Sequence, residues 1–149
     1  KTIHNMNNRT FTIIKPNAVG AGNTGKIIDH LIREGFKIRA MKYICLSRNQ
    51  AEKFYDVHRG KPFFPSLVDF MTSGPIVVAV LERENAVAEL RRVVGNTDPA
   101  KAAEGTIRRL YGEDVQHNAI HASDSDENAA IEAVRFFSDD EIIIVDYNG

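Results

Sequence analysis

His121 and Glu132 are two side chains that together can support nucleophilic chemistry. The apolar pair Ala119 and Ile120 leads into His121, small polar and acidic residues follow it, and a helical pattern begins near residue 128. A strand rises about 3.3 Å per residue and a helix about 1.5 Å. A helix that runs back along its strand therefore returns Glu132 to the level of His121, where the carboxylate can bind the imidazole.

A carboxylate on one imidazole nitrogen sets the tautomer and leaves the other nitrogen free to attack an electrophile. We expect His121 to face the start of the following helix, whose positive end and free N–H groups suit an anionic substrate. Ser123 to Asp126 contains several N-cap candidates, and Asp124 with Glu127 three residues on resembles a capping box, so we expect that helix to begin there. A structural histidine beside a capped helix is the alternative, and residue types alone do not decide between the two.

The composition is that of a globular protein with no nucleic-acid or membrane signature. The chain has 149 residues, 43% of them hydrophobic and 26% charged, and we expect residues 1–149 to form a single domain with residues 1–8 as an N-terminal extension. A net charge of −1 argues against a basic nucleic-acid surface. The longest apolar run, Ile76 to Leu81, is too short to span a membrane, and the polar start does not resemble a signal peptide. The expected location is the cytoplasm.

The single cysteine excludes an internal disulfide and a cysteine-rich zinc site. Cys45 lies within the apolar run Tyr43 to Leu46, so we expect a buried and inert thiol. Glycines are frequent from Val19 to Gly25, but the P-loop motif is incomplete because Ile27 stands where a hydroxyl residue is required, so a plain loop is expected.

Strand and helix patterns alternate along the chain. Strands are predicted at residues 10–14, 36–46, 76–81 and around His121, and the apolar run at 76–81 predicts a central strand covered on both faces. The helical patterns occupy residues 27–35 with Gly35 as C-cap, 47–57 with a Ser47–Gln50 capping box, 67–71, 84–94 and 129–137. Residues 142–145 are expected to pack as an extended tail. This order predicts an α/β (α+β) ferredoxin-like split βαβ sandwich, with helices packed on a four-stranded antiparallel sheet.

Five segments, taken in order, resemble the nucleoside diphosphate kinase family over almost the whole chain, from about Arg9 to Phe137. They are Thr10–Pro16, Lys61–Phe64, Met71–Pro75, Gly105–Arg108 and Asn118–Ser125. The resemblance implies a ferredoxin-like fold and a kinase that transfers the γ-phosphate of a nucleoside triphosphate to a nucleoside diphosphate. It further implies a ping-pong reaction through phosphohistidine, with broad base specificity.

The same resemblance implies a role for each site residue. His121 is the expected nucleophile through Nδ1, Glu132 orients it, Ser123 sits beside it and Tyr55 lies near the γ-phosphate. Phe63 is expected to stack on the base, with Val115 on its other face and Asn118 at the sugar. The expected phosphate-binding set is Lys15, Arg91, Thr97 and Arg108. No Asn or Gln is adjacent to Phe63 in the sequence to contact a base edge, so base discrimination should be modest.

The resemblance implies Mg²⁺ as cofactor and a homo-oligomer, either a hexamer or a tetramer built on a shared dimer. Mg²⁺ prefers phosphate oxygens and water, so no direct protein ligand is expected, and Asp124 contacts the ion at most through a water molecule. The loop from Gly95 to Asn118 departs from the usual family pattern, for example with Gln116-His117 in place of Gly-Arg.

Two other functions remain open on the sequence. One is a non-catalytic, nucleotide-binding regulatory module of ferredoxin-like fold. The other is a phospho-acceptor protein in which His121 receives phosphate from a partner kinase. Formation of GTP from ATP and GDP discriminates the kinase from both.

Overall fold

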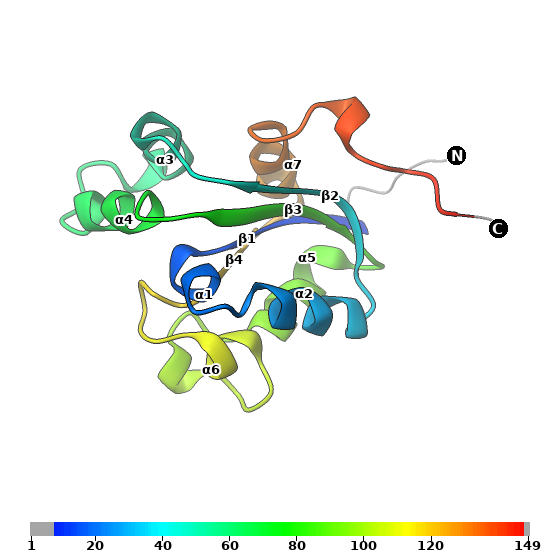
Figure 1. The fold of residues 1–149 in the computed structure, drawn as a ribbon, viewed down its shortest axis with the longest axis horizontal. Helices are drawn as coiled ribbons and strands as arrows, with labels where there is room; N and C mark the ends of the chain where they lie inside the picture. Colours follow the sequence, from blue (N-terminus) through cyan, green and yellow to red (C-terminus); the bar gives the residue numbers. More distant parts are fainter. Residues whose placement is uncertain (1–7, 148–149) are drawn as a thin grey trace.

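A four-stranded antiparallel sheet organises the molecule, whose computed structural model describes residues 8–147. Its order is β2-β3-β1-β4. The strands are β1 (Arg9–Ile14), β2 (Lys37–Ile44), β3 (Ile76–Glu82) and β4 (Ile120–Ala122). With helices packed on the sheet, this is the predicted ferredoxin-like α/β sandwich (Figure 1).

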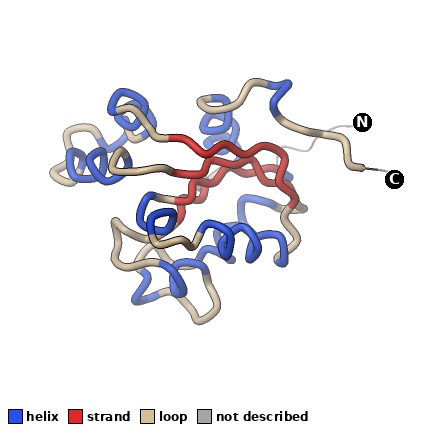
Figure 2. Tube along the Cα trace, in the orientation of Figure 1, coloured by secondary structure: helices blue, strands red, loops and turns tan. Residues whose placement is uncertain are grey.

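Helices cover both faces of the sheet (Figures 1 and 2). One layer contains α3 (Arg48–Phe54), α4 (Phe64–Met71) and α7 (Asp126–Val134), and the opposite layer contains α1 (Pro16–Gly20), α2 (Thr24–Arg33), α5 (Ala86–Val94) and α6 (Ile107–Tyr111). Short 3-10 turns occur at Asp56–His58, Pro99–Lys101 and Asp139–Glu141. Within the described residues, no helix combines the length and the apolar character that crossing a membrane requires.

β3 is the central strand that the apolar run predicted, and it pairs with β2 on one side and β1 on the other. Successive strand side chains point to opposite faces. Val77 and Leu81 therefore join the core packed by α2 and α5, whereas Val78 and Val80 join the core packed by α3 and α4. Each face of the sheet thus buries its own apolar layer, which explains why β3 has no polar face.

The Ser47–Gln50 capping box is confirmed at the start of α3. Ser47 Oγ accepts a hydrogen bond from the Gln50 backbone N–H at 3.1 Å, and Gln50 Oε1 accepts from the Ser47 backbone N–H at 2.8 Å. The helix ends at Phe54, short of the expected residue 57, because the chain tightens into a 3-10 turn at Asp56–His58. Gly35 follows the observed C-cap, Glu34, and has a φ of 92° that favours glycine.

The capping box expected at Asp124 and Glu127 is wrong. Ser125 is the N-cap of α7, and its hydroxyl accepts from the Asn128 backbone N–H at 3.0 Å. The Asp124 carboxylate instead accepts from the Asn128 side-chain amide at 2.6 Å. Several cap-forming residues stand in a row here, and only the extended backbone of Ser125 selects one of them.

Two expectations for apolar segments also change. Cys45 is exposed, not buried, because it directly follows β2, the edge strand, where one side of the alternation faces outward. Of the tail at residues 142–145, Ile142 packs against the core and the Ile143 backbone N–H donates to Arg39 O at 2.8 Å, while Ile144 and Val145 are exposed. Apolar composition alone does not show whether a segment lies at the edge of the sheet or in the core.

Shortening the Ser47 side chain tests how far α3 depends on its cap. Ser47→Ala should lower the free energy of unfolding by about 1 kcal/mol, because the Gln50 N–H loses its acceptor. Urea denaturation of wild type and variant measures the change, and Ser47→Asn is the matched control that retains a capping oxygen. A Ser47→Ala protein as stable as the wild type would show that tertiary packing alone defines the start of α3.

Candidate active site

His121 lies in β4, opposite Ile13 of β1, and the Thr12 hydroxyl donates to the His121 carbonyl at 2.7 Å. Its Nε2 is 2.8 Å from Glu132 Oε1 on α7. The Ser123 hydroxyl donates to the same carboxylate oxygen at 2.6 Å. An ionised carboxylate accepts from both, so the imidazole proton belongs on Nε2 and Nδ1 carries the lone pair. No hydrogen bond links Nδ1 to any residue within 8–147.

Aromatic rings restrict the remaining motion of the His121 side chain. The Phe54 ring meets it edge-on with centroids 5.3 Å apart, and Phe11 lies at 6.3 Å on the sheet. Tyr55 packs against Phe54 at 4.9 Å. Burial, reinforced by the charge of Glu132, raises the pKa of Tyr55, and the buried hydroxyl has no hydrogen-bond partner among the described residues. Tyr55 thus lies beside the His121–Glu132 pair as a neutral phenol.

A sharp turn just before β4 separates His121 from the residues that precede it. Ala119 has a φ of 76° and is fully buried, an arrangement that costs a non-glycine residue on the order of 1–2 kcal/mol. The Ile120 N–H donates to Asn118 O at 3.0 Å, and the Lys15 N–H donates to Ala119 O at 2.8 Å. The turn therefore brings Asn118 to Lys15 while His121 continues along the strand.

Lys15 and Arg108 are two buried cations without carboxylate partners among the described residues. Lys15 Nζ donates to Asn118 Oδ1 at 2.8 Å, and Arg108 donates to Gly95 O at 3.0 Å and Ile120 O at 2.9 Å. Burial, with a smaller contribution from the charge of Arg108, lowers the pKa of Lys15 to about 7. Burial, followed by the charge of Arg91, lowers the pKa of Arg108 to about 10.

Two arginines bind backbone carbonyls of the residues that flank His121. Arg108 bonds Ile120 O and Arg91 donates to Ala122 O at 3.3 Å, so they contact the residues on either side of His121. The charge of Arg108 lowers the pKa of Lys15 and that of Arg91 lowers the pKa of Arg108, and a bound anion would stabilise the charged form of both. The structure therefore brings together a free imidazole nitrogen and a site for a multiply charged anion.

The remaining expected residues lie around this centre. The Asn118 amide donates to Thr97 O at 3.1 Å and to Val115 O at 3.0 Å, which ties the loop residues to one another. Phe63 precedes α4 with 45% of its surface exposed, and Val115 is 57% exposed. Thr97 and Arg91 are also exposed. Exposed apolar side chains at these two positions suit a flat ligand group that covers both.

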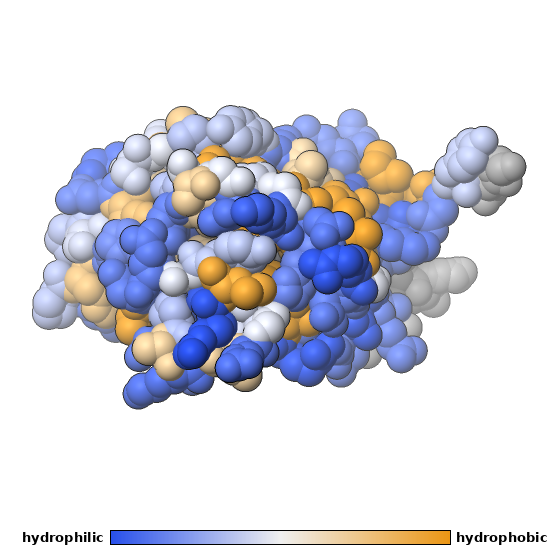
Figure 3. All heavy atoms as spheres, turned by 60° about the horizontal axis from the view of Figure 1, so that its bottom comes forward, coloured by the Kyte–Doolittle hydropathy of each residue, from blue (hydrophilic) through white to orange (hydrophobic). Residues whose placement is uncertain are grey.

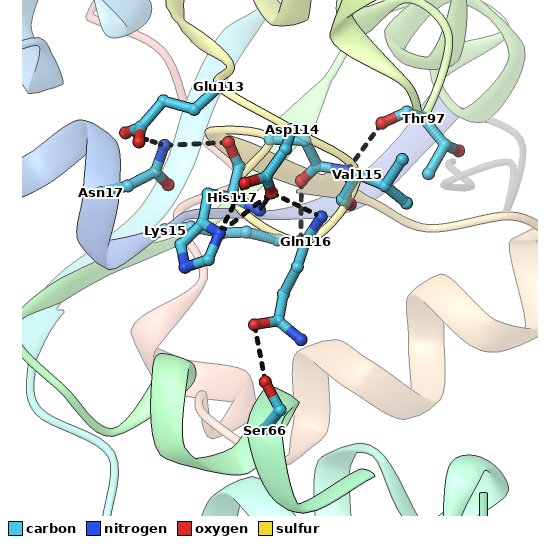
Figure 4. Close-up of polar contacts among 10 residues, drawn as sticks. Lys15, Asn17, Ser66, Thr97, Glu113, Asp114, Val115, Gln116 and His117 are labelled. Carbon is cyan, nitrogen blue, oxygen red and sulfur yellow. Dashed lines mark hydrogen bonds and ion pairs between the residues drawn. The ribbon is translucent and has the colours of Figure 1, made fainter. Parts of the chain in front are cut away.

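Residues 113–118 form a loop that is fastened to its neighbours on two sides (Figure 4). On one side the Asn17 amide donates to His117 O at 3.1 Å, and on the other Ser66 of α4 donates to Gln116 Oε1 at 3.1 Å. The sequence reasoning missed Gln116 and Phe54. Phe54 directly precedes the expected site residue Tyr55, and this adjacency could have indicated it. No local pattern places Gln116 beside α4.

No group of three or more potential metal ligands exists among residues 8–147. Asp124 is exposed, and its hydrogen bond from Asn128, together with the charge of Arg91, lowers its pKa and keeps it ionised. This donor set fits a divalent cation held chiefly by the oxygens of a bound polyphosphate, not by a protein cage.

The lowered pKa of Lys15 makes stability depend on pH in a defined window. Between pH 7 and 10.5 the unfolded chain binds the proton more often than the folded one, so stability rises with pH. The slope is up to about 1.4 kcal/mol per pH unit. Lys15→Met should remove this slope. Urea unfolding at pH 7, 8 and 9 measures it, and Lys26→Met, on the exposed side of α2, is the matched control. Parallel curves for wild type and Lys15→Met would contradict the pKa assignment.

Comparison with known proteins gives a consistent result over most of the chain. The family model described as nucleoside diphosphate kinase matches residues 8–142. The nucleoside diphosphate kinase of Phenylobacterium zucineum is 56% identical over 138 residues, which cover 93% of this chain and 99% of the relative. That of Chlorobium chlorochromatii is 54% identical over 135 residues, with 91% and 96% covered.

Two solved structures share the fold. The Aquifex aeolicus nucleoside diphosphate kinase superposes with a TM-score of 0.88 at 47% identity and covers 91% of this chain and 99% of its own. A halophilic nucleoside diphosphate kinase from Halobacterium salinarum in complex with CDP gives a TM-score of 0.91 at 39% identity, with 95% of each chain covered. With the sheet order and the His121–Glu132 pair, these matches show that the chain belongs to the nucleoside diphosphate kinase family.

Proposed function

We propose that His121 carries the phosphoryl group in the nucleoside diphosphate kinase reaction of this chain. The observation behind the proposal is the 2.8 Å contact between His121 Nε2 and Glu132, which leaves the Nδ1 lone pair free. Nδ1 attacks the γ-phosphorus of a nucleoside triphosphate, the P–N bond forms, and the bond to the bridging oxygen breaks so that the diphosphate leaves. A second diphosphate then attacks the phosphohistidine through a β-phosphate oxygen, and the P–N electron pair returns to Nδ1.

Glu132 and Ser123 act on this step through the imidazole. As the phosphate bonds to Nδ1, the ring gains positive charge, and a carboxylate on Nε2–H stabilises that charge. The Ser123 hydroxyl holds the carboxylate in place through its 2.6 Å bond. Tyr55, buried and neutral beside the pair, is proposed to donate its unpartnered hydroxyl toward the γ-phosphate.

Lys15, Arg91, Thr97 and Arg108 are proposed to bind the phosphates. Charge builds on phosphate oxygens during phosphoryl transfer, and positioned cations supply most of the catalysis. A bound polyphosphate stabilises the charged form of Lys15 and offsets the mutual repulsion described above. Asn118 Oδ1 has a second lone pair besides the one used by Lys15, and we assign it to a sugar hydroxyl.

Family members require a divalent cation, which we propose is Mg²⁺ in this chain. When bound, it neutralises phosphate charge and orients the triphosphate. The exposed and ionised Asp124 is the one carboxylate that we assign to it, through a water molecule. The base is proposed to stack between Phe63 and Val115. Stacking accepts every base, which agrees with the broad specificity of the expected reaction.

We further propose that residues 1–149 are one domain that assembles as a homo-oligomer, a hexamer or tetramer built on a dimer. The support is the edge strand β2, whose Met41 and Tyr43 are exposed, and the exposed Ile32 of the adjacent α2. The face brought forward from the bottom of Figure 1 is largely hydrophilic, with hydrophobic side chains gathered in separate patches (Figure 3).

Cytoplasmic location remains a prediction, which cell fractionation would check.

Replacement of the two nearby histidines tests the nucleophile. With ATP and Mg²⁺ alone, the wild type should become labelled on histidine, in a form that is labile to acid and stable to alkali. His121→Ala should lose the label and the transfer of phosphate from ATP to GDP. His117→Ala should keep the label, because the His117 ring is engaged by Asp114 at 2.9 Å and by Phe70. Equal losses in both variants, or an acid-stable label, would remove His121 from the mechanism.

The proposed division between phosphate and base contacts has its own test. Arg108→Ala should lower turnover more than Phe63→Ala does, because charge develops on the phosphates and not on the base. Phe63→Ala should weaken ADP, GDP, CDP and UDP together, by on the order of 1–3 kcal/mol. Transfer efficiency with each diphosphate measures both effects. A Phe63→Ala loss confined to one base would contradict a stacking role.

A further inference from the structure

Gln116 spans the gap between its loop and α4, as Figure 4 shows. Its backbone is well held, because Asp114 Oδ1 accepts from the Gln116 N–H at 3.0 Å and from the His117 N–H at 2.7 Å. The Ser66 hydroxyl then fixes the far end of the side chain through Oε1 at 3.1 Å. The residue is therefore held at its backbone and at its carboxamide, although the bond to Ser66 is exposed to solvent.

The bond between Gln116 and Ser66 joins the two segments that carry the side chains proposed to stack on the base. Val115 directly precedes Gln116, and Ser66 follows Phe63 by three residues, a spacing that puts two side chains on one side of a helix start. When a base stacks between Phe63 and Val115, these side chains cover its two faces. Its edge then faces the side chain that bridges the loop and α4. Gln116 is that side chain.

The orientation of the amide determines what it can recognise. Because Oε1 accepts from Ser66, the two N–H groups of Nε2 point elsewhere, and they make no hydrogen bond with any residue of the described range. A free N–H group can donate to a keto oxygen, whereas an exocyclic amino group is itself a donor and cannot accept from it. Within the purines the group at position 6 is either keto or amino, and within the pyrimidines the same is true of the group at position 4.

We propose that Gln116 is a specificity-determining residue for the nucleotide base. It donates from Nε2 to the 6-keto or 4-keto oxygen and so favours keto bases over their amino counterparts, while Ser66 holds it in that orientation. This inference rests on the proposed function of the site. The preference should be about twofold to tenfold, the range that one partly exposed hydrogen bond supports, which remains compatible with the use of all bases.

The test compares acceptor pairs that differ at the position in question. The kcat/KM values for IDP against ADP, and for UDP against CDP, are measured with GTP as donor. In the wild type both ratios should exceed one. Gln116→Leu should bring both to about one, and Gln116→Glu, which can only accept, should invert them. Ser66→Ala should reduce them by releasing the amide. Asn49→Leu, an exposed change on α3, is the control and should leave both ratios as in the wild type.

Three outcomes would overturn the proposal. One is a pair of ratios that Gln116→Leu leaves unchanged. Another is an equal rise of kcat/KM for all four acceptors in Gln116→Leu and Ser66→Ala. That result would mean that the Gln116–Ser66 bond only restricts access to the nucleotide site. The third is an effect that follows the 2-amino group, measured with GDP against IDP and with ATP as donor, because transfer from GTP to GDP gives no net reaction. Labelling of His121 by GTP without acceptor is followed separately, so that a failure of the proposed function is distinguished from a failure of this assignment.

Discussion

The hydrogen bond between His121 Nε2 and Glu132 is the interaction on which the site depends. It joins an edge strand to a helix across the sheet face, and it converts an ordinary imidazole into one with a defined free nitrogen. The surrounding architecture serves this contact. β4 is aligned by its pairing with β1, α7 is started by Ser125, and the Ser123 hydroxyl, completely buried, holds the carboxylate. A shift of about 1 Å in any of these elements would break it.

A second constraint is the presence of buried positive charge without carboxylate partners in the described chain. Lys15 and Arg108 bond to a side-chain amide and to backbone carbonyls, which hold them in place without neutralising them. Burial of this charge is unfavourable, as the lowered pKa of Lys15 indicates. In the proposed function, a bound polyphosphate offsets this lost stability and meets groups that are already in position, as phosphoryl transfer requires.

In the proposed site, the loop at residues 113–118 links these two features to the base. One end, at Asn118, contacts Lys15, and its middle contacts α4 through Gln116. By the roles proposed above, a change in this loop would act on phosphate binding and on base selection together. This coupling gives physical meaning to the departure from the family pattern at Gln116-His117, because a glycine at position 116 has no side chain to reach Ser66.

The sequence alone determined the fold class and the central strand, and it predicted the meeting of His121 with Glu132. The apolar run of β3 admits no exposed face, and the spacing from His121 to Glu132 is a consequence of the rise per residue in strand and helix. It also supplied the cap of α3, since the Ser47–Gln50 box is formed by residues three apart. Each of these features depends on residues that are close together in the sequence, or on the regular geometry of a strand or helix.

Only the tertiary structure decided the features that depend on contacts between distant segments. Cys45 is exposed because β2 lies at the edge of the sheet, a fact that no local pattern contains. Ser125 was selected over Asp124 as the cap by backbone conformation, not by residue type. The meeting of Gln116 with Ser66 joins residues 50 positions apart in sequence, and pairing between surface side chains at such separation is set by how the layers pack.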